Sequence, residues 1–217
     1  MFTLGVPTLN RYDLLAELIA SCEAGTRKPD KYFIVDNGTK LAITSLPESA
    51  RARVHIHNPQ KNIGVAASCN LIHKSCGDIT MIAGDDTLMN VDTVEQMEKH
   101  ALETDALFLF PYGGNQHKFA CSIQKAELFA RIGYYDERFH PCYFEDNDFA
   151  YRMIMANIPM VSVPNIGYTH RTSSTIAKFN DKEMKQHHIN FERNKAYYAE
   201  KWGGQPHFEK YTKPFGK

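Results

Sequence analysis

A short apolar run that ends on two adjacent carboxylates constrains this chain more than any other feature. Residues 79–83 are apolar apart from one Thr, and Asp85 and Asp86 follow directly after Gly84. Such a run is typical of a strand buried on both faces of a parallel sheet. In open α/β sheets the ligand binds outside the carboxyl ends of the strands. Two acids there suit Mg²⁺, which proteins commonly bind through one or two carboxylates together with substrate phosphates. A solvated turn is the alternative, and the rest of the chain decides between them.

The composition limits the class of protein. A chain of 217 residues with 43% hydrophobic residues can bury one substantial core, and its formal net charge is zero. Zero net charge gives no electrostatic reason to expect a nucleic-acid or anionic-membrane partner, although a local patch stays possible. The five cysteines are scattered without a Cys-x-x-Cys pair, which favours a reduced, cytoplasmic protein. A strand pattern begins at once, so no signal peptide is expected, and no apolar run is long enough for a transmembrane segment.

Strand and helix patterns alternate along the first half. Strands are predicted at 2–6, 32–35, 54–58 and 79–83, and helices at 13–24, 62–76 and 92–102. Pro7 is expected to end the first strand, and the polar alternation of 54–58 indicates an edge strand. Asn10 or Asp13 is expected to cap the first helix, and Asp92 and Glu95 have the spacing of a capping box. This order predicts an α/β fold whose doubly wound, mostly parallel sheet has helices on both faces.

The second half is more irregular. Strands are predicted at 106–110, 119–123, 161–164 and 168–171, helices at 125–132 and 145–155, and loops at 111–114 and 134–143. The aromatic side chains of Phe139, Tyr143 and Phe144 are expected to form a wall of a ligand site. Three acids open the helix at 145, where the helix dipole favours negative charge, and Asp148 and Arg152 are spaced to pair. Met184, Phe191, Tyr198 and Trp202 form an apolar stripe that predicts a C-terminal helix packed on the domain.

Seven short motifs, in order along nearly the whole chain, resemble those of the family 2 glycosyltransferases, which have the GT-A fold. They are Val6-Pro7-Thr8-Leu9-Asn10-Arg11, Val35-Asp36-Asn37-Gly38, Asn62-Ile63-Gly64-Val65-Ala66 with Asn70, Gly84-Asp85-Asp86-Thr87, Gly133 to Phe139, Glu145-Asp146-Asn147-Asp148 with Arg152, and His170. Each motif is weak alone, but seven in order on predicted strand ends and loops are specific. The resemblance implies a Rossmann-like GT-A domain over 1–217, with a nucleotide-binding half (1–105), an acceptor and catalytic half (106–178) and a helical C-terminal segment (179–217).

The resemblance implies a metal-assisted, inverting transfer of a sugar from a nucleotide-diphospho donor to an acceptor hydroxyl. A divalent cation, Mn²⁺ or Mg²⁺, can stabilise the departing diphosphate as a Lewis acid. Asp86 is the implied direct ligand, and His170 matches the position from which a His completes the metal shell. Gly84 stands where relatives usually have a first acid, so Asp85 is expected to face the ribose or to reach the metal through water.

A general base is also needed, because a sugar hydroxyl attacks poorly until its proton is removed. Asp146 matches the catalytic acid position of the family, with Glu145 beside it. We expect Asp146 to be ionised at neutral pH, because the helix N-terminus favours its charge. The alternative is that these acids only begin a helix.

The resemblance places nucleotide binding in the first half. Its implied contacts come from two strand ends and from one loop where a glycine allows close approach. They are Pro7, Thr8, Asn10, Arg11, Asp36, Asn62 and Gly64, together with Asp85 and Asp86. Asp36 could accept a hydrogen bond from an imide N–H, which favours a UDP- or dTDP-sugar over a guanosine donor.

Two other classes of protein remain alternatives. A sugar nucleotidylyltransferase would carry a Gly-rich phosphate loop with Arg and Lys near its N-terminus, and residues 6–13 contain no such loop. A non-catalytic nucleotide-sugar-binding protein could use the same fold, since fold does not fix function. The acceptor stays open among a glycan, a lipid-linked sugar, a protein, a small metabolite and modified DNA, and the oligomeric state stays open too.

Overall fold

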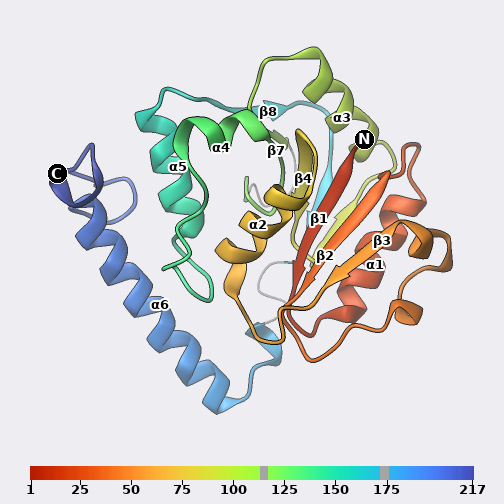
Figure 1. The fold of residues 1–217 in the computed structure, drawn as a ribbon, viewed down its shortest axis with the longest axis horizontal. Coiled ribbons are helices and arrows are strands. Elements are labelled where there is room, and N and C mark those ends of the chain that lie inside the picture. Colours follow the sequence, from red (N-terminus) through yellow and green to blue (C-terminus); the bar gives the residue numbers. More distant parts are fainter. Residues whose placement is uncertain (113–116, 172–175) are drawn as a thin grey trace.

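The structure, a computed structural model, describes residues 1–112, 117–171 and 176–217. The predicted loop at 111–114 therefore lies partly outside the described residues. The helices and strands alternate through most of the chain (Figure 1). The strands are β1 (Thr3–Thr8), β2 (Lys31–Asp36), β3 (Val54–His57), β4 (Ile79–Ala83), β5 (Thr87–Met89), β6 (Phe108–Pro111), β7 (Cys121–Lys125), β8 (Met160–Val163) and β9 (Tyr168–His170). The α-helices are α1 (Tyr12–Glu23), α2 (Gly64–Ser75), α3 (Thr93–Glu103), α4 (Ala126–Ile132), α5 (Glu145–Met155) and α6 (Asp181–Trp202).

Seven of the strands form one sheet in the order β3-β2-β1-β4-β7-β6-β8, and only β7 runs antiparallel to its neighbours. The chain leaves β1 toward β2 and β3 and then returns to the other side of β1 as β4. The strand order therefore reverses between β1 and β4, which is where ligands bind in open α/β sheets. The mostly parallel α/β sheet expected from the sequence is confirmed, as is the edge position of β3.

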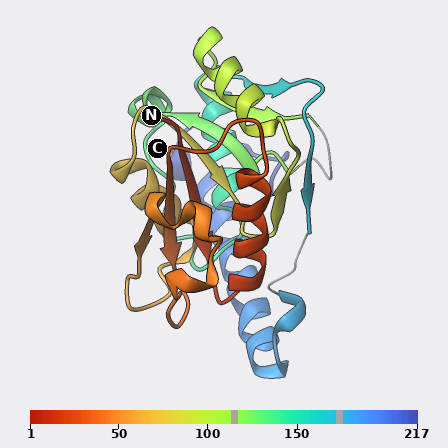
Figure 2. The same ribbon diagram turned by 90° about the vertical axis from the view of Figure 1, so that its right-hand side faces the viewer.

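Helices cover both faces of this sheet, as Figures 1 and 2 show from two directions. Apolar residues of α1 and α3 pack on one face, where Leu15, Leu18 and Met97 are fully buried. Residues of α2, α4 and α5 pack on the other, around Phe108, Phe149 and their neighbours. The continuous apolar runs of β1, β2 and β4 follow from this two-sided cover.

Pro7 does not end the first strand. β1 continues through Pro7 to Thr8, and its last residues pair with Val35 and Asp36 of β2. The register with β4 on the other side stops at Gly5. A proline, which has no N–H, is therefore accommodated beyond the last residue that pairs on both sides.

Two predicted helix caps are wrong. Helix α1 begins after Arg11 without a side-chain cap, and the Asn10 Oδ1 atom instead accepts a hydrogen bond from the backbone N–H of Thr39 at 2.9 Å. At α3 the Asp92 side chain forms no cap bond, and Glu95 accepts the Thr26 hydroxyl at 2.6 Å. Long-range partners compete successfully with local capping at both positions. A capping box does form at the start of α6, between Asn180 and Glu183.

The aromatic loop before α5 packs against α6 and does not form a sugar-binding wall. Phe139 is fully buried and its ring lies 4.9 Å from that of Tyr197. Phe144 contacts Phe191 and Tyr198, while Tyr143 contacts Phe191 and His187. This cluster buries Tyr198 and Trp202, the C-terminal part of the predicted apolar stripe. Met184, near the start of α6, is 42% exposed.

A buried charge cluster fixes α6 to α5. Asp148 of α5 accepts hydrogen bonds from Arg152 and from the Trp202 indole, each at 2.9 Å, and Lys201 lies 2.5 Å from it. The predicted Asp148–Arg152 pair is thus present. No helix in the described part of the chain is long and apolar enough to cross a bilayer.

Candidate functional site

The ends of β1 and β4 meet at the point where the strand order reverses. Gly5 of β1 is in register with Ile82 of β4, so Thr8 and Asp85, each three residues further on, reach one another. The Thr8 hydroxyl donates a hydrogen bond to Asp85 Oδ2 at 2.7 Å. Asp85 is buried, and burial raises the pKa of its carboxyl to about 6 even though Thr8 and Arg11 act in the opposite direction. The hydrogen bond between Thr8 and Asp85 therefore joins the ends of β1 and β4, next to a second acid.

That second acid, Asp86, faces a histidine from a distant part of the chain. The two-stranded sheet of β5 and β9 pairs Thr87 with His170, and the backbone N–H of Arg171 donates to the Asp86 carbonyl. His170 Nε2 consequently lies 3.2 Å from Asp86 Oδ1. The structure thus brings together the two residues that the sequence proposed as metal ligands.

This pair fits a divalent cation. Two atoms that each lie about 2.1 Å from a metal, at right angles to one another, are about 3.0 Å apart, close to the distance seen here. A Cβ atom at Gly84 would come 2.9 Å from Asp86 Oδ1, so the glycine leaves room for this carboxylate. Among the described residues no three His, Cys, Asp or Glu side chains gather to hold a metal by themselves. Substrate oxygens or water would have to complete the coordination.

The two acids predicted to be catalytic, Glu145 and Asp146, lie at the first turn of α5. Asp146 Oδ1 accepts the backbone N–H of Asn147, yet burial raises the pKa of Asp146 above its ordinary value. Burial thus opposes the favourable helix dipole on which the expectation of an ionised Asp146 rests. Glu145 is more deeply buried, its Oε2 atom has no hydrogen-bond partner, and burial raises its pKa well above the usual range. Of the two carboxyls, Asp146 is the better suited to act as a base.

His117 is a site residue that sequence reasoning missed. Its ring contacts that of His170 edge-on, with centroids 5.7 Å apart, and its backbone carbonyl accepts the Tyr168 hydroxyl. Its electrostatic interaction with Asp146 also opposes the effect of burial on the pKa of that acid. His117 thus lies between the Asp86–His170 pair and the acids of α5. It belongs to no recognised motif, so only the spatial contact with His170 reveals it.

The burial of Glu145 predicts a pH effect on stability. The unfolded chain releases this proton near the ordinary pKa of 4.5, whereas the folded chain retains it to higher pH. This residue should therefore lower the free energy of unfolding as pH rises above that value, by at most about 1.4 kcal/mol per pH unit. Glu145→Gln has no proton to lose and should show a flatter pH profile in denaturant unfolding between about pH 5 and pH 8. Equal slopes for both proteins would contradict the burial of a neutral Glu145.

The predicted nucleotide-binding residues at the ends of β1 and β2 already form hydrogen bonds with their neighbours. Asp36 is 1% exposed, and its carboxylate accepts hydrogen bonds from Tyr12, Gly38, Leu41 and Asn58. Both oxygens are therefore already occupied, so an imide contact would have to replace one of these donors. Arg11 forms two hydrogen bonds to Asp13, and its charge lies close enough to Asp85 to affect the pKa of that acid. Pro7 is half-buried at the same strand end.

Asn62 and Gly64 contact another loop. The Asn62 side chain accepts the Gly64 N–H at 2.8 Å, and the Asn62 carbonyl faces His140 Nε2 at 3.0 Å. Gly64 has φ +82°, and a Cβ atom there would come 2.8 Å from the Pro141 carbonyl oxygen. The requirement for glycine thus arises from backbone packing. Asn37 supports the same helix start, donating to Ser68 and accepting from Ile63.

Gly64→Ala should destabilise the protein by about 1–3 kcal/mol, because the substitution combines positive φ with a close backbone contact. Gly77→Ala is the matched control, since a Cβ atom at Gly77 would meet nothing within 4 Å. Both changes can be measured by urea unfolding with a common slope. A loss at Gly64 no larger than that at Gly77 would show that the Gly64–Pro141 contact is not tight.

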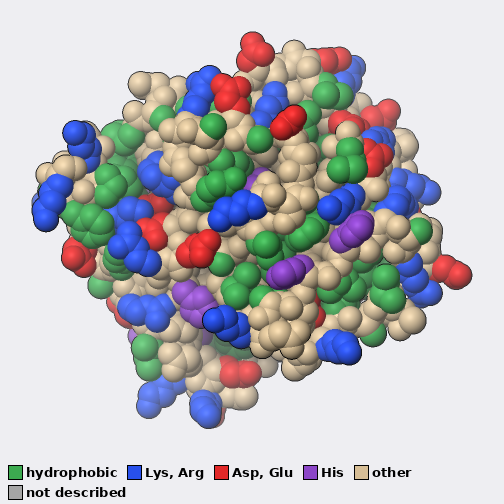
Figure 3. Space-filling model, viewed as in Figure 1, with side chains coloured by type: hydrophobic (Ala, Val, Ile, Leu, Met, Phe, Trp, Pro, Cys, Tyr) green, Lys and Arg blue, Asp and Glu red, His purple; other side chains and the backbone are tan. Residues whose placement is uncertain are grey.

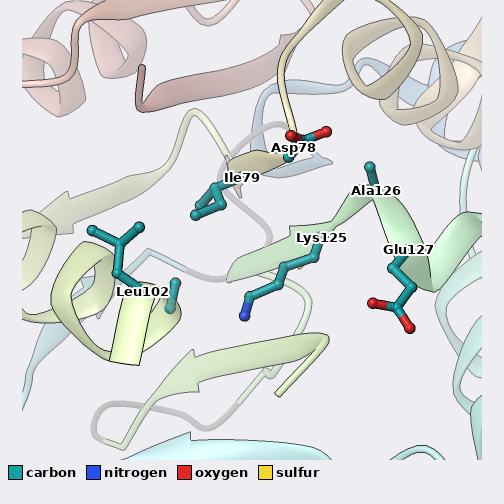
Figure 4. A pocket seen from close by; sticks show the side chains of 7 residues that line it. Asp78, Ile79, Leu102, Lys125, Ala126 and Glu127 are labelled. Atoms are coloured by element: carbon teal, nitrogen blue, oxygen red, sulfur yellow. The ribbon is translucent and has the colours of Figure 1, made fainter. Parts of the chain in front are cut away.

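A shallow pocket of about 380 Å³ lies away from these residues, at the other end of β4 (Figure 4). Its lining includes Asp78 and Ile79 at the start of β4, Lys125 at the end of β7, Glu127 of α4 and Leu102 of α3. Parallel strands place their ligands at the carboxyl ends, so this pocket is not the candidate active site.

Comparison with known families and structures identifies the family and the fold of this chain. The profile of the family described as "Glycosyl transferase family 2" matches residues 3–159. No curated protein sequence matches significantly. Among similar structures, a mannosyltransferase, PcManGT from Pyrobaculum calidifontis in complex with GDP-Man and Mn²⁺, is 15% identical, with a TM-score of 0.64 over 80% of this chain and 57% of its own.

S. aureus TarS is 16% identical, with a TM-score of 0.65 over 79% of this chain and 37% of its own. Residues 1–349 of TarS in complex with UDP-GlcNAc are 15% identical, with a TM-score of 0.63 over 87% of this chain and 66% of that one. The chain therefore spans between 37% and 66% of these structures. At such identities the likeness shows a shared GT-A fold.

Proposed function

This chain belongs to glycosyl transferase family 2, and we propose that it moves a sugar from a nucleotide-diphospho donor to an acceptor hydroxyl with inversion and with a divalent cation. A UDP- or dTDP-sugar is the favoured donor. The observation that carries the proposal is the 3.2 Å pairing of Asp86 with His170 beside the acids of α5. The Mn²⁺ and GDP-Man bound to PcManGT, and the UDP-GlcNAc bound to TarS, support the same ligand classes here.

Each residue has a separate task in this proposal. Asp86 and His170 would hold Mn²⁺ or Mg²⁺, which when bound supplies Lewis-acid stabilisation to the departing diphosphate. Thr8, Asp85 and Arg11 shape the strand ends beside the donor, with Pro7, Asn10 and Asp36 at the nucleoside and Asn62 and Gly64 at the neighbouring loop. These contacts orient the donor so that its anomeric carbon is open to attack from the opposite side.

The chemical step is a single displacement. Asp146 takes the proton of the acceptor hydroxyl while the hydroxyl oxygen bonds to the anomeric carbon. The bond from that carbon to the diphosphate oxygen breaks at the same time, and its electron pair leaves with the nucleoside diphosphate. Attack opposite the leaving group inverts the anomeric configuration. Glu145, whose pKa burial raises well above its ordinary value, lies buried beside Asp146 in the first turn of α5.

A panel of nucleotide sugars read by thermal unfolding tests the proposal. A donor present at about 100 times its Kd raises stability by about 2.7 kcal/mol, which gives a measurable rise in Tm. We expect uridine or thymidine donors with Mn²⁺ to produce the largest rise, and a chelator to abolish most of it. Stabilisation by nucleoside triphosphates with sugar phosphates would favour a nucleotidylyltransferase. No rise with any nucleotide sugar would contradict the donor assignment.

A further inference from the structure

A second groove, of about 680 Å³, lies along the exposed side of α2. Its walls come from the end of β3 and the following loop, from α2 and from the loop before α5. The polar side chains that line it are His57, Lys61, Asn62, Asn70, Lys74, Glu137 and His140. Asp86, His170 and Asp146 are not among the lining residues, so the groove lies outside the proposed chemical centre and meets the proposed donor-binding residues only at Asn62.

The lining of the groove carries two lysines and one acid, an excess of one positive charge, although the whole chain is neutral. Lys61 and Lys74 are exposed, and within the described residues neither forms an ion pair. The Lys74 ammonium lies 4.7 Å from the centre of the Tyr134 ring, which holds it at this end of the groove. The one acid, Glu137, already accepts a hydrogen bond from Asn70 at 2.8 Å. Figure 3 shows Lys, Arg and His side chains across the middle of this face, with acids mostly toward its rim.

The two lysines lie at opposite ends of the groove. Lys61 precedes the first turn of α2, and Lys74 lies in its last turn. Ten residues of α-helix rise about 15 Å, so the two charges are separated by roughly that length. One phosphate group spans far less, and the two lysines together suit a ligand with several anionic groups along its length.

We propose that this groove binds an extended chain that carries repeated phosphate groups, a ligand class that the proposed donor does not include. No Phe, Tyr or Trp lines the groove. Single-stranded nucleic acids are commonly held by bases stacked on such rings, so the lining favours recognition of the phosphates over recognition of bases. Asn62 and His140 continue the groove to the start of α2, where exposed polar groups can bind the groups between the phosphates.

The test is binding of short-chain fluorescent polyphosphate, measured by anisotropy with chelator present and again with saturating UDP and Mn²⁺. Lys61→Gln and Lys74→Gln should each weaken binding about three- to five-fold, and the double variant about ten- to twenty-fold. Lys99→Gln is the matched control, because Lys99 is an equally exposed helical lysine on α3 and has no ion pair within the described residues. It should change binding less than about two-fold, since surface substitutions away from a site have small effects.

Three results would overturn the proposal. The double variant could bind polyphosphate as tightly as the parent, or UDP could displace the chain, which would place it at the donor site. A thymidine oligonucleotide with the same number of phosphates could bind more tightly than polyphosphate, which would assign the groove to nucleic acid. Failure of the protein to bind any nucleotide sugar would refute the proposed function and leave this test intact, because the arm with chelator measures polyphosphate binding without donor or metal.

Discussion

Replacing Asp146 by Asn should lower the rate of sugar transfer by about 10²–10⁴-fold, the usual contribution of a general base. The substitution keeps the shape of the side chain and removes its ability to accept a proton. Donor affinity should stay nearly unchanged, because Asp86 and His170 lie on the diphosphate side of the proposed site. Burial raises the pKa of Asp146, and only its ionised form is a base. Transfer should therefore decline on acidification at a higher pH than an ordinary aspartate would give.

Glu145→Gln is the control for this experiment. Glu145 is adjacent in sequence and more deeply buried, and its raised pKa means that glutamine resembles the form already present. We expect this variant to retain most of the transfer rate. Near-parental transfer by Asp146→Asn would remove Asp146 from the mechanism. An equal loss of donor affinity would make it a binding residue.

Asp86→Ala should remove most of the gain in nucleotide affinity that Mn²⁺ or Mg²⁺ provides. Even substitutions in the second shell of a metal site weaken binding about 10–100-fold, so loss of a direct ligand should have at least that effect. His170→Ala should have a similar but smaller effect, since the carboxylate also supplies charge. Titration calorimetry with UDP, in Mn²⁺ and in chelator, measures both changes.

Asp78→Ala is the matched control for Asp86. Asp78 is an exposed aspartate at the opposite end of β4, beside the shallow pocket of Figure 4. Its removal should leave the metal-dependent affinity unchanged. Equal affinity of the parent for UDP with metal and with chelator would show that Asp86 and His170 pair for a structural reason alone.

The buried strands of the first half were predictable because their signals are local. The apolar runs that form β1, β2 and β4 follow from burial on both faces, and parallel strands place their carboxyl ends at one edge. The proximity of Thr8 to Asp85 follows from that geometry. The proximity of Asp86 to His170 could be predicted only from the family resemblance, because the pairing of β5 with β9 leaves no local signal in the sequence.

Features decided by distant partners could not be read from the sequence. Asn10 and Glu95 have the chemistry of caps, but Thr39 and Thr26 bind them instead. The rings of Phe139 and Phe144 suit a sugar, but α6 covers them. The ionisation of Asp146 depends on distant partners in the same way: the helix dipole at Asp146 is visible in the sequence, whereas the burial that opposes it depends on the packed fold. His117 is recognised only once its ring lies against His170.

In the proposed mechanism, transfer of the sugar from its nucleotide donor requires both Asp86 and Asp146. The direct test is release of nucleoside diphosphate from UDP- and dTDP-sugars, with Mn²⁺, by the parent, Asp86→Ala and Asp146→Asn proteins. A pool of candidate hydroxyl acceptors is included. We predict release by the parent, its loss in chelator and in Asp86→Ala, and a drop of about 10²–10⁴-fold in Asp146→Asn with donor binding retained. Release that continues undiminished in both variants would contradict the proposed site.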